Sequence, residues 1–193
     1  MPLSPAQLAE LVGQADEALA AIQSEHGRSN VVEARIRFPR GFILPASTYR
    51  RTLSDIGTDV QRRNASYALM TLDVFRWLCV RTDISGAALS MIVKEAISIV
   101  GTLCEWMTKE ATRGAGSSRR YTVRTSRLVN ADVIDAALKD ELDWVWSTRC
   151  NEHLHNVTSL EHEMYSRADY NRALAAFKAL KRALVVVHGG RGV

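Results

Sequence analysis

The sequence predicts an all-α protein: an antiparallel helical bundle of four to five main helices with an N-terminal helix and an irregular or short-strand segment. Apolar residues recur at helical spacing over most of the chain. No internal repeat occurs, and strands do not alternate with helices, which favours a bundle over an α/β fold. With 193 residues, 47% of them apolar and 24% charged, the chain can build one good core.

Residues 1–56 are expected to form an N-terminal helix followed by a basic irregular extension. Residues 4–25 carry apolar residues at helical spacing, with Ser4 as the N-cap, a proline at the first helical position and Gly27 just past the end. Alternating apolar and polar residues over 32–38 suggest a short strand, and prolines and glycines then indicate a loop. We expect this part to pack with the rest of the chain as one domain.

Residues 57–193 are expected to form the bundle itself. Its first helix runs from about residue 58 to Arg81, and a turn follows in which Asp83 or Ser85 can cap the next helix. That next helix, about 86–111, is the most apolar in the chain and should be the central buried element.

The second half of the bundle contains two more predicted helices and two connections. The Gly-, Ser- and Arg-rich residues 112–126 are expected to be a mobile connection, after which Asn130 can cap a helix. Residues 156–166 form a polar connection. Ser166 and Asp169 then resemble a capping box at the start of the last amphipathic helix, which a Gly-Gly pair ends.

Composition and charge placement exclude several classes of protein. Charged residues interrupt the longest apolar stretch before it reaches the 18 or so residues of a membrane span, and acidic residues in the first helix argue against a signal peptide. The three cysteines lie far apart with no CxxC, which favours a reduced interior over a disulfide framework. We therefore expect a soluble cytoplasmic protein with no membrane partner.

Basic residues are concentrated in two segments. The net charge is +4, yet residues 28–63 and residues 113–127 each carry +5. Such regions suit contact with RNA, although Arg-rich solvated loops would look the same. The second segment supplies the candidate RNA-binding residues, in which the tyrosine could stack on a base: Arg113, Arg119, Arg120, Tyr121 and Arg124.

Common catalytic and cofactor motifs are absent. No P-loop, dinucleotide-binding glycine motif or nucleophile elbow occurs. One group of histidines and glutamates matches no standard metal-site spacing, so neither a metal nor another cofactor is expected. That group comprises Glu152, His153, His155, Glu161, His162 and Glu163.

Arg149 is the most informative residue. It follows Trp146 by three positions and Val145 by four, so it shares a helical face with the apolar stripe. A guanidinium there needs partners, and Glu105 in the most apolar helix is a candidate for an ion pair. An arginine shortly before histidines also provides the parts for phosphodiester chemistry: a cation that stabilises phosphate charge and an imidazole that exchanges a proton. RNA supplies its own 2′-hydroxyl nucleophile, so such chemistry needs no metal.

The run from Arg149 to His155 resembles the signature of HEPN domains, in which an arginine is followed after four to six residues by a histidine, with a polar residue near the arginine. The resemblance covers about residues 60–187. It extends to the turn at 81–86, the end of the apolar helix at 104–107 and the segment at 169–173 that opens the last helix.

This resemblance implies a metal-independent endoribonuclease in which two copies bring their motifs together across a homodimer interface. Many members are toxins or act in phage defence, which implies a cognate antitoxin or defence-system protein as a further partner. Arg149 would stabilise the phosphate, His155 would act as acid or base, and Asn151 would help hold the site together. Cys150 departs from the pattern, because the family often has a polar residue there.

Alternatives remain at the histidine and in the function. On an unbroken helix His153 would face the same way as Arg149, whereas the family spacing prefers His155, so both are candidates. Other HEPN domains have lost catalysis and bind RNA or protein partners, which is the alternative function. A purely structural helical adaptor is a third reading.

Overall fold

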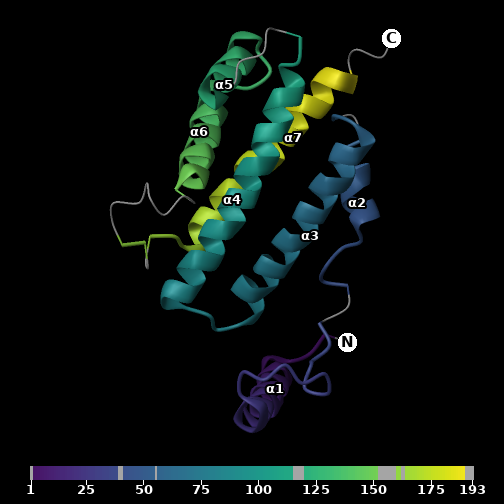
Figure 1. Ribbon diagram of the computed structural model, residues 1–193, viewed down its shortest axis with the longest axis vertical. Helices are drawn as coiled ribbons and strands as arrows, with labels where there is room; N and C mark the ends of the chain where they lie inside the picture. Colours follow the sequence, from purple (N-terminus) through teal and green to yellow (C-terminus); the bar gives the residue numbers. More distant parts are fainter. Residues whose placement is uncertain are drawn as a thin grey trace. The chain divides into compact units, whose positions relative to one another are not determined.

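The computed structural model describes residues 2–38, 41–54, 56–114, 120–151, 160–161 and 164–189. Every regular element in these ranges is an α-helix, which confirms the predicted all-α class (Figure 1). The helices are α1 (Pro5–His26), α2 (Ala46–Arg51), α3 (Asp59–Arg81), α4 (Gly86–Ala111), α5 (Tyr121–Asn130), α6 (Ala136–Cys150) and α7 (Arg167–Gly189).

The chain divides into two compact units, residues 1–40 and residues 41–193. From the sequence we expected this boundary after residue 56, and we expected one domain. The difference arises because α2 packs on α3, and because Leu53 and Ile56 are buried in the core of the second unit. Apolar side chains at the end of the expected extension thus belong to the bundle.

In the first unit, local signals fix α1. The hydroxyl of Ser4 accepts a hydrogen bond from the Gln7 amide, and the Gln7 side chain accepts one from the Ser4 amide, which completes a capping box. Gly27 ends the helix with φ at 55°, a left-handed angle that glycine adopts without strain. Residues 31–38 form turns and irregular chain, so the suggested strand is wrong. A strand needs a hydrogen-bonded partner, and the described residues provide none.

In the second unit, α4 is the central helix, as predicted. It packs against α3, α5, α6 and α7, and its inward residues, such as Ile97 and Val100, are fully buried. An 18-residue window of α4 is long and apolar enough to cross a membrane by composition, with a mean hydropathy of 1.6. The prediction that no segment approaches this limit was therefore too strict. Since 56% of the window is buried inside the bundle, α4 is consistent with the core helix of a soluble protein.

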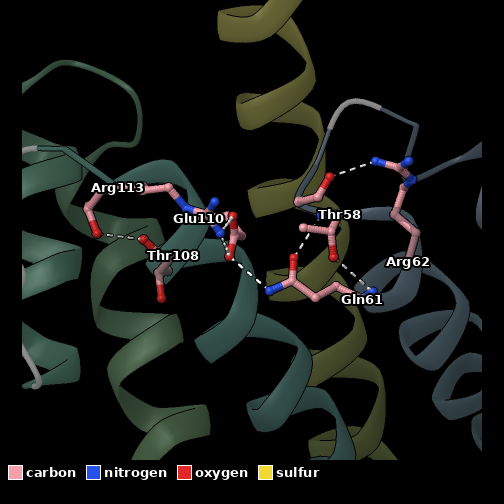
Figure 2. Close-up of polar contacts among 8 residues, drawn as sticks. Thr58, Gln61, Arg62, Thr108, Glu110 and Arg113 are labelled. Atoms are coloured by element: carbon pink, nitrogen blue, oxygen red, sulfur yellow. Dashed lines mark hydrogen bonds and ion pairs between the residues drawn. The ribbon is translucent and has the colours of Figure 1, made fainter.

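The ends of α3 and α4 are tied together by polar side chains (Figure 2). Thr58 caps α3 by accepting from the Gln61 amide, and the Gln61 side-chain amide donates to Glu110 near the end of α4, at 3.2 Å. Arg113, in the turn after α4, pairs with the same carboxylate. The start of α3 therefore lies beside the end of α4, as an antiparallel pair requires.

The structure corrects the sequence analysis over residues 112–135. Tyr121–Asn130 is the helix α5, whereas residues 112–126 were expected to be a mobile connection and Asn130 was expected to cap the next helix. The actual cap of α6 is Asp135, whose side chain accepts from the Leu138 amide at 2.7 Å. The Arg-rich pattern hid α5 because its buried face includes polar residues.

The last helix begins as predicted. The Ser166 amide and hydroxyl both donate to Asp169, at 2.8 and 2.7 Å, and α7 runs from Arg167 to Gly189. The Arg167 guanidinium donates to the carbonyls of Cys79 and Ile84, which joins the start of α7 to the turn between α3 and α4.

Candidate functional site

Arg149 lies in the last turn of α6, where α6 packs tightly against Gly101 of α4. Val145, one turn earlier, is fully buried, so the predicted shared face is the face that packs on the core. Gly101 of α4 permits the approach. A Cβ added to Gly101 would meet the Arg149 Cβ at 2.9 Å, closer than real Cβ contacts come, and Cδ at 3.2 Å, which is tighter than most. The position of Arg149 thus depends on a glycine in the middle of α4.

The Arg149 side chain is held on three sides. Its terminal nitrogen pairs with Glu105 at 3.6 Å, and its Nε donates to the Thr102 hydroxyl at 3.3 Å. Its guanidinium lies 4.7 Å from the ring centroid of Trp146, a cation–π distance. The ion pair with Glu105 confirms the partner named from the sequence. The guanidinium is therefore held in place, while 28% of the Arg149 side chain as a whole remains exposed.

Glu105 is shared between two arginines. Its second oxygen lies 3.6 Å from the guanidinium of Arg124 on α5, whose side chain is only 4% exposed. Arg124 lies over the ring of Tyr121, and that ring stacks on Trp146 with centroids 4.7 Å apart. These five residues (Glu105, Tyr121, Arg124, Trp146 and Arg149), here called the Glu105 cluster, carry one negative and two positive charges. The Glu105 cluster therefore has a net positive charge, and Arg149 is the arginine of the cluster that is partly exposed to solvent.

Burial changes the role of two predicted RNA-binding residues. Tyr121 is 2% exposed and Arg124 is 3% exposed. The Tyr121 hydroxyl has no hydrogen-bond partner among the described residues, and burial raises the pKa of this group above its ordinary value. A ring that is covered by Trp146 cannot stack on a base, so the RNA-binding assignment of Tyr121 and Arg124 is corrected to a structural one.

The remaining basic candidates lie nearer to solvent. Arg113 has a side chain that is 64% exposed and pairs with Glu110 (Figure 2). Arg120 is exposed directly before α5. Arg119 lies outside the described residues. Arg113 and Arg120 therefore remain the accessible part of the predicted RNA-binding set.

A second polar cluster, which the sequence analysis did not identify, lies on the same face of α4 as Glu105. Lys94 and Glu161 form an ion pair at 2.5 Å, with side chains only 5% and 10% exposed. The Ser90 hydroxyl donates to the Glu161 carbonyl and accepts from the Tyr165 amide, each at 3.0 Å. The sequence signal was a lysine within the most apolar helix, which we used only to argue against a membrane span. We call Ser90, Lys94, Glu161 and Tyr165 the Lys94 cluster.

Asn151 connects the end of α6 to the Lys94 cluster. Its side chain donates a hydrogen bond to the Tyr165 hydroxyl, which lowers the pKa of that group, although burial, the larger effect, raises it overall. The Tyr165 hydroxyl in turn donates to Glu161 at 3.1 Å.

The predicted histidines cannot be added to this geometry. His153 and His155 lie outside the described residues, as do Glu152, His162 and Glu163 of the histidine–glutamate group. The described member, Glu161, is engaged by Lys94. Within the described ranges, no group of three or more histidine, cysteine or acidic side chains is arranged to hold a metal ion.

The end of α6 therefore lies between two polar clusters. Glu105 and Lys94 are eleven residues apart on α4, which corresponds to about 16 Å along the helix. Arg149 contacts the first cluster, and Asn151 contacts the second. Such an arrangement can present a fixed cation to an anionic ligand, and the histidines follow Arg149 a few residues later in the sequence.

Comparisons with protein-family models, curated proteins and solved structures found no match for this chain. The fold and the site define the protein as an all-α bundle in which Glu105 pairs with a buried arginine, Arg124, and with a partly exposed arginine, Arg149.

Proposed function

We propose that this protein is a metal-independent endoribonuclease of the HEPN type, with an active site formed by two copies of the chain and a role as a toxin or in phage defence. The observation that carries the proposal is the state of Arg149. Its guanidinium is oriented by Glu105, Thr102 and Trp146, and 28% of the side chain is still exposed. A rigid, permanently charged group of this kind suits a phosphodiester, whose oxygens it can contact in a forked geometry.

In the proposed reaction the RNA 2′-hydroxyl attacks the adjacent phosphorus and the bond to the 5′-oxygen breaks. Arg149 stabilises the additional negative charge on the phosphoryl oxygens in the transition state. A histidine, His155 or His153, takes the proton of the 2′-hydroxyl or protonates the leaving oxygen. The products are a 2′,3′-cyclic phosphate and a 5′-hydroxyl. Asn151 acts through its hydrogen bond to Tyr165, as a positioning residue.

The test is a cleavage assay with purified full-length protein on a mixed pool of tRNA and mRNA, in the presence of EDTA. The wild type is compared with Arg149→Ala, His155→Ala and His153→Ala. We expect cleavage by the wild type with cyclic-phosphate ends, loss of cleavage in Arg149→Ala and in one histidine variant, and no cleavage of DNA of the same sequence. Specific activity should rise with protein concentration as dimers form.

Arg172 offers a matched control. It also pairs with a glutamate, Glu141 at 2.6 Å, and lies 3.9 Å from the ring centroid of a tryptophan, Trp144. Arg172→Ala removes the same kinds of contact away from the proposed site, so it should leave cleavage intact. Retained cleavage in Arg149→Ala and in both histidine variants would refute the proposal.

The alternative is a non-catalytic bundle that binds RNA or a protein. It is favoured by the engagement of Arg149 with Glu105, which is also a sufficient structural role, and by the exposed apolar side chains of α1, such as Leu8 and Leu11. For RNA binding it predicts no cleavage and an affinity that falls steeply with salt. Arg113→Ala and Arg120→Ala should then weaken binding, whereas Arg149→Ala should not.

A further inference from the structure

A cavity of about 390 Å³ lies in the second unit, between the segment that contains α2 and the helices α3 and α7. Its interior is lined by apolar side chains of two long helices: Leu69 and Leu72 from α3, and Leu174 and Phe177 from α7. This volume lies within the range of about 300–1,000 Å³ that is typical of small-molecule sites. The cavity is separate from the Glu105 cluster and shares no residue with it.

One wall of the cavity is fastened through Asp73 on α3. Its carboxylate accepts a hydrogen bond from the Leu44 amide at 3.0 Å and another from the Tyr49 hydroxyl. Burial and this hydrogen bond raise the pKa of Tyr49, so the hydroxyl keeps its proton and remains a donor. Asp73 is the acidic side chain among the lining residues. Both hydrogen bonds go to the same carboxylate oxygen, and they attach the segment with Leu44 and Tyr49 to α3.

The cationic side of the cavity is formed by Arg76, Lys178 and Lys181. No carboxylate in the described part of the chain forms an ion pair with Lys178 or Lys181. Burial, with smaller contributions from Lys178 and Arg182, lowers the pKa of Lys181. Lys178, which is exposed, and Lys181, which is partly buried, thus stand beside an apolar interior with no acidic partner among the described residues. A bound anion would supply the missing charge.

We propose that this cavity binds a small amphipathic organic carboxylate, with the apolar body against Leu69, Leu174 and Phe177 and the carboxylate at Lys178 and Lys181. A purely apolar ligand would leave the two lysines at the cavity without a counter-charge. An inorganic anion would leave the apolar walls exposed to water. A carboxylate on an apolar chain satisfies both, and it contacts residues that the proposed ribonuclease reaction does not use.

The test is calorimetric titration of the full-length protein with straight-chain carboxylates from hexanoate to decanoate. Each added methylene that enters the cavity should tighten binding about fourfold, which corresponds to about 0.8 kcal/mol of apolar burial. Octanol, which has the same chain as octanoate without the charge, should bind markedly more weakly. The double variant Lys178→Gln/Lys181→Gln should weaken octanoate binding about tenfold, as expected for lost hydrogen bonds to a charged group.

Control measurements separate a built site from general apolar adsorption. Lys109 is exposed near the end of α4 and does not line the cavity, so Lys109→Gln should bind octanoate as the wild type does. Lys178 is exposed and Lys181 is partly buried, so the double variant should still fold. Far-ultraviolet circular dichroism checks that the bundle is intact. Absence of octanoate and decanoate binding, or equal binding by the wild type and the double variant, would overturn the proposal. Equal affinity for octanol and octanoate would overturn it as well.

Discussion

Glu105 supplies the negative charge that holds the two arginines of the Glu105 cluster, and Glu105→Gln tests this role directly. The substitution keeps the shape of the side chain and removes its negative charge. Arg124, whose side chain is 4% exposed, and Arg149, which is 28% exposed, then lose the carboxylate that lies 3.6 Å from each of them. Two like charges would remain near one another beside the core, so we expect the variant to fold but to be less stable.

The magnitude follows from the exposure of the groups. Breaking a fully buried ion pair costs about 3–5 kcal/mol, and breaking an exposed pair costs about 0–1 kcal/mol. Glu105 is 33% exposed while Arg124 is buried, so an intermediate loss of about 2–3 kcal/mol is expected. For a chain of this length, each 1 kcal/mol lost from the free energy of unfolding lowers the melting temperature by about 2–4 °C. The melting temperature should therefore fall by about 4–12 °C.

Urea denaturation followed by far-ultraviolet circular dichroism measures this loss. The midpoint should fall while the slope of free energy against urea stays unchanged, because the surface exposed on unfolding is the same. Glu141→Gln is the matched control, since Glu141 is 40% exposed and pairs with Arg172. Its cost should not exceed about 1 kcal/mol. Equal costs for the two variants would show that the Glu105 cluster stabilises the bundle no more than an exposed ion pair does.

Three further substitutions or measurements test other parts of the second unit. Lys94→Met leaves the nearly buried carboxylate of Glu161 without its cation, so unfolding experiments should show a loss of about 3–5 kcal/mol. Gly101→Ala presses a methyl group on Arg149, so urea denaturation should show a loss of about 1–3 kcal/mol. Burial raises the pKa of the Cys104 thiol to about 12. The folded thiol therefore stays protonated while the unfolded thiol ionises above its ordinary pKa of about 9, so this thiol's contribution to stability should fall as the pH rises from about 9 to 12. A Cys104→Ala variant should lose that part of the pH dependence.

Each of these predictions has a control and a contradicting result. Lys139 pairs with Asp143 but is 27% exposed, so Lys139→Met should cost far less than Lys94→Met, and similar costs would contradict the argument from burial. Gly13 has no atom within 4 Å of an added Cβ, so Gly13→Ala should raise the helix content. Wild-type stability of Gly101→Ala would show that the helices can move apart. Rapid labelling of Cys104 at pH 8 in the folded protein would refute its burial.

The sequence predicted much of the fold because the helix ends carry local signals. Ser4 and Ser166 form the capping interactions expected of them, and the most apolar helix has the predicted bounds, Gly86–Ala111. α5 was missed because its buried face contains Arg124. From the sequence alone, a charged residue is expected to be exposed unless a partner for it is known. The partner of Arg124 is Glu105, which lies on another helix.

The candidate site was predictable only in part. Arg149 and its partner Glu105 followed from the apolar face on which Arg149 lies, because a cation there requires a nearby anion. Tyr121 was assigned to RNA binding because arginines surround it in the sequence. In the structure its ring stacks on Trp146 instead. The role of Gly101 is invisible in one helix alone, because it depends on how closely a second helix approaches.

By itself, the sequence determined the all-α class, the ends of the long helices α1, α3, α4 and α7, and the place of Arg149 on the apolar face of its helix. These features depend on hydrogen bonds and apolar spacing within a few residues, so a short stretch of sequence is enough to predict them. Only the tertiary structure decided the boundary at residue 40, the burial of Tyr121 and Arg124, and the pairing of Lys94 with Glu161. Those features depend on contacts between residues far apart in the chain, where the free energy of a charge is set by the side chain that faces it.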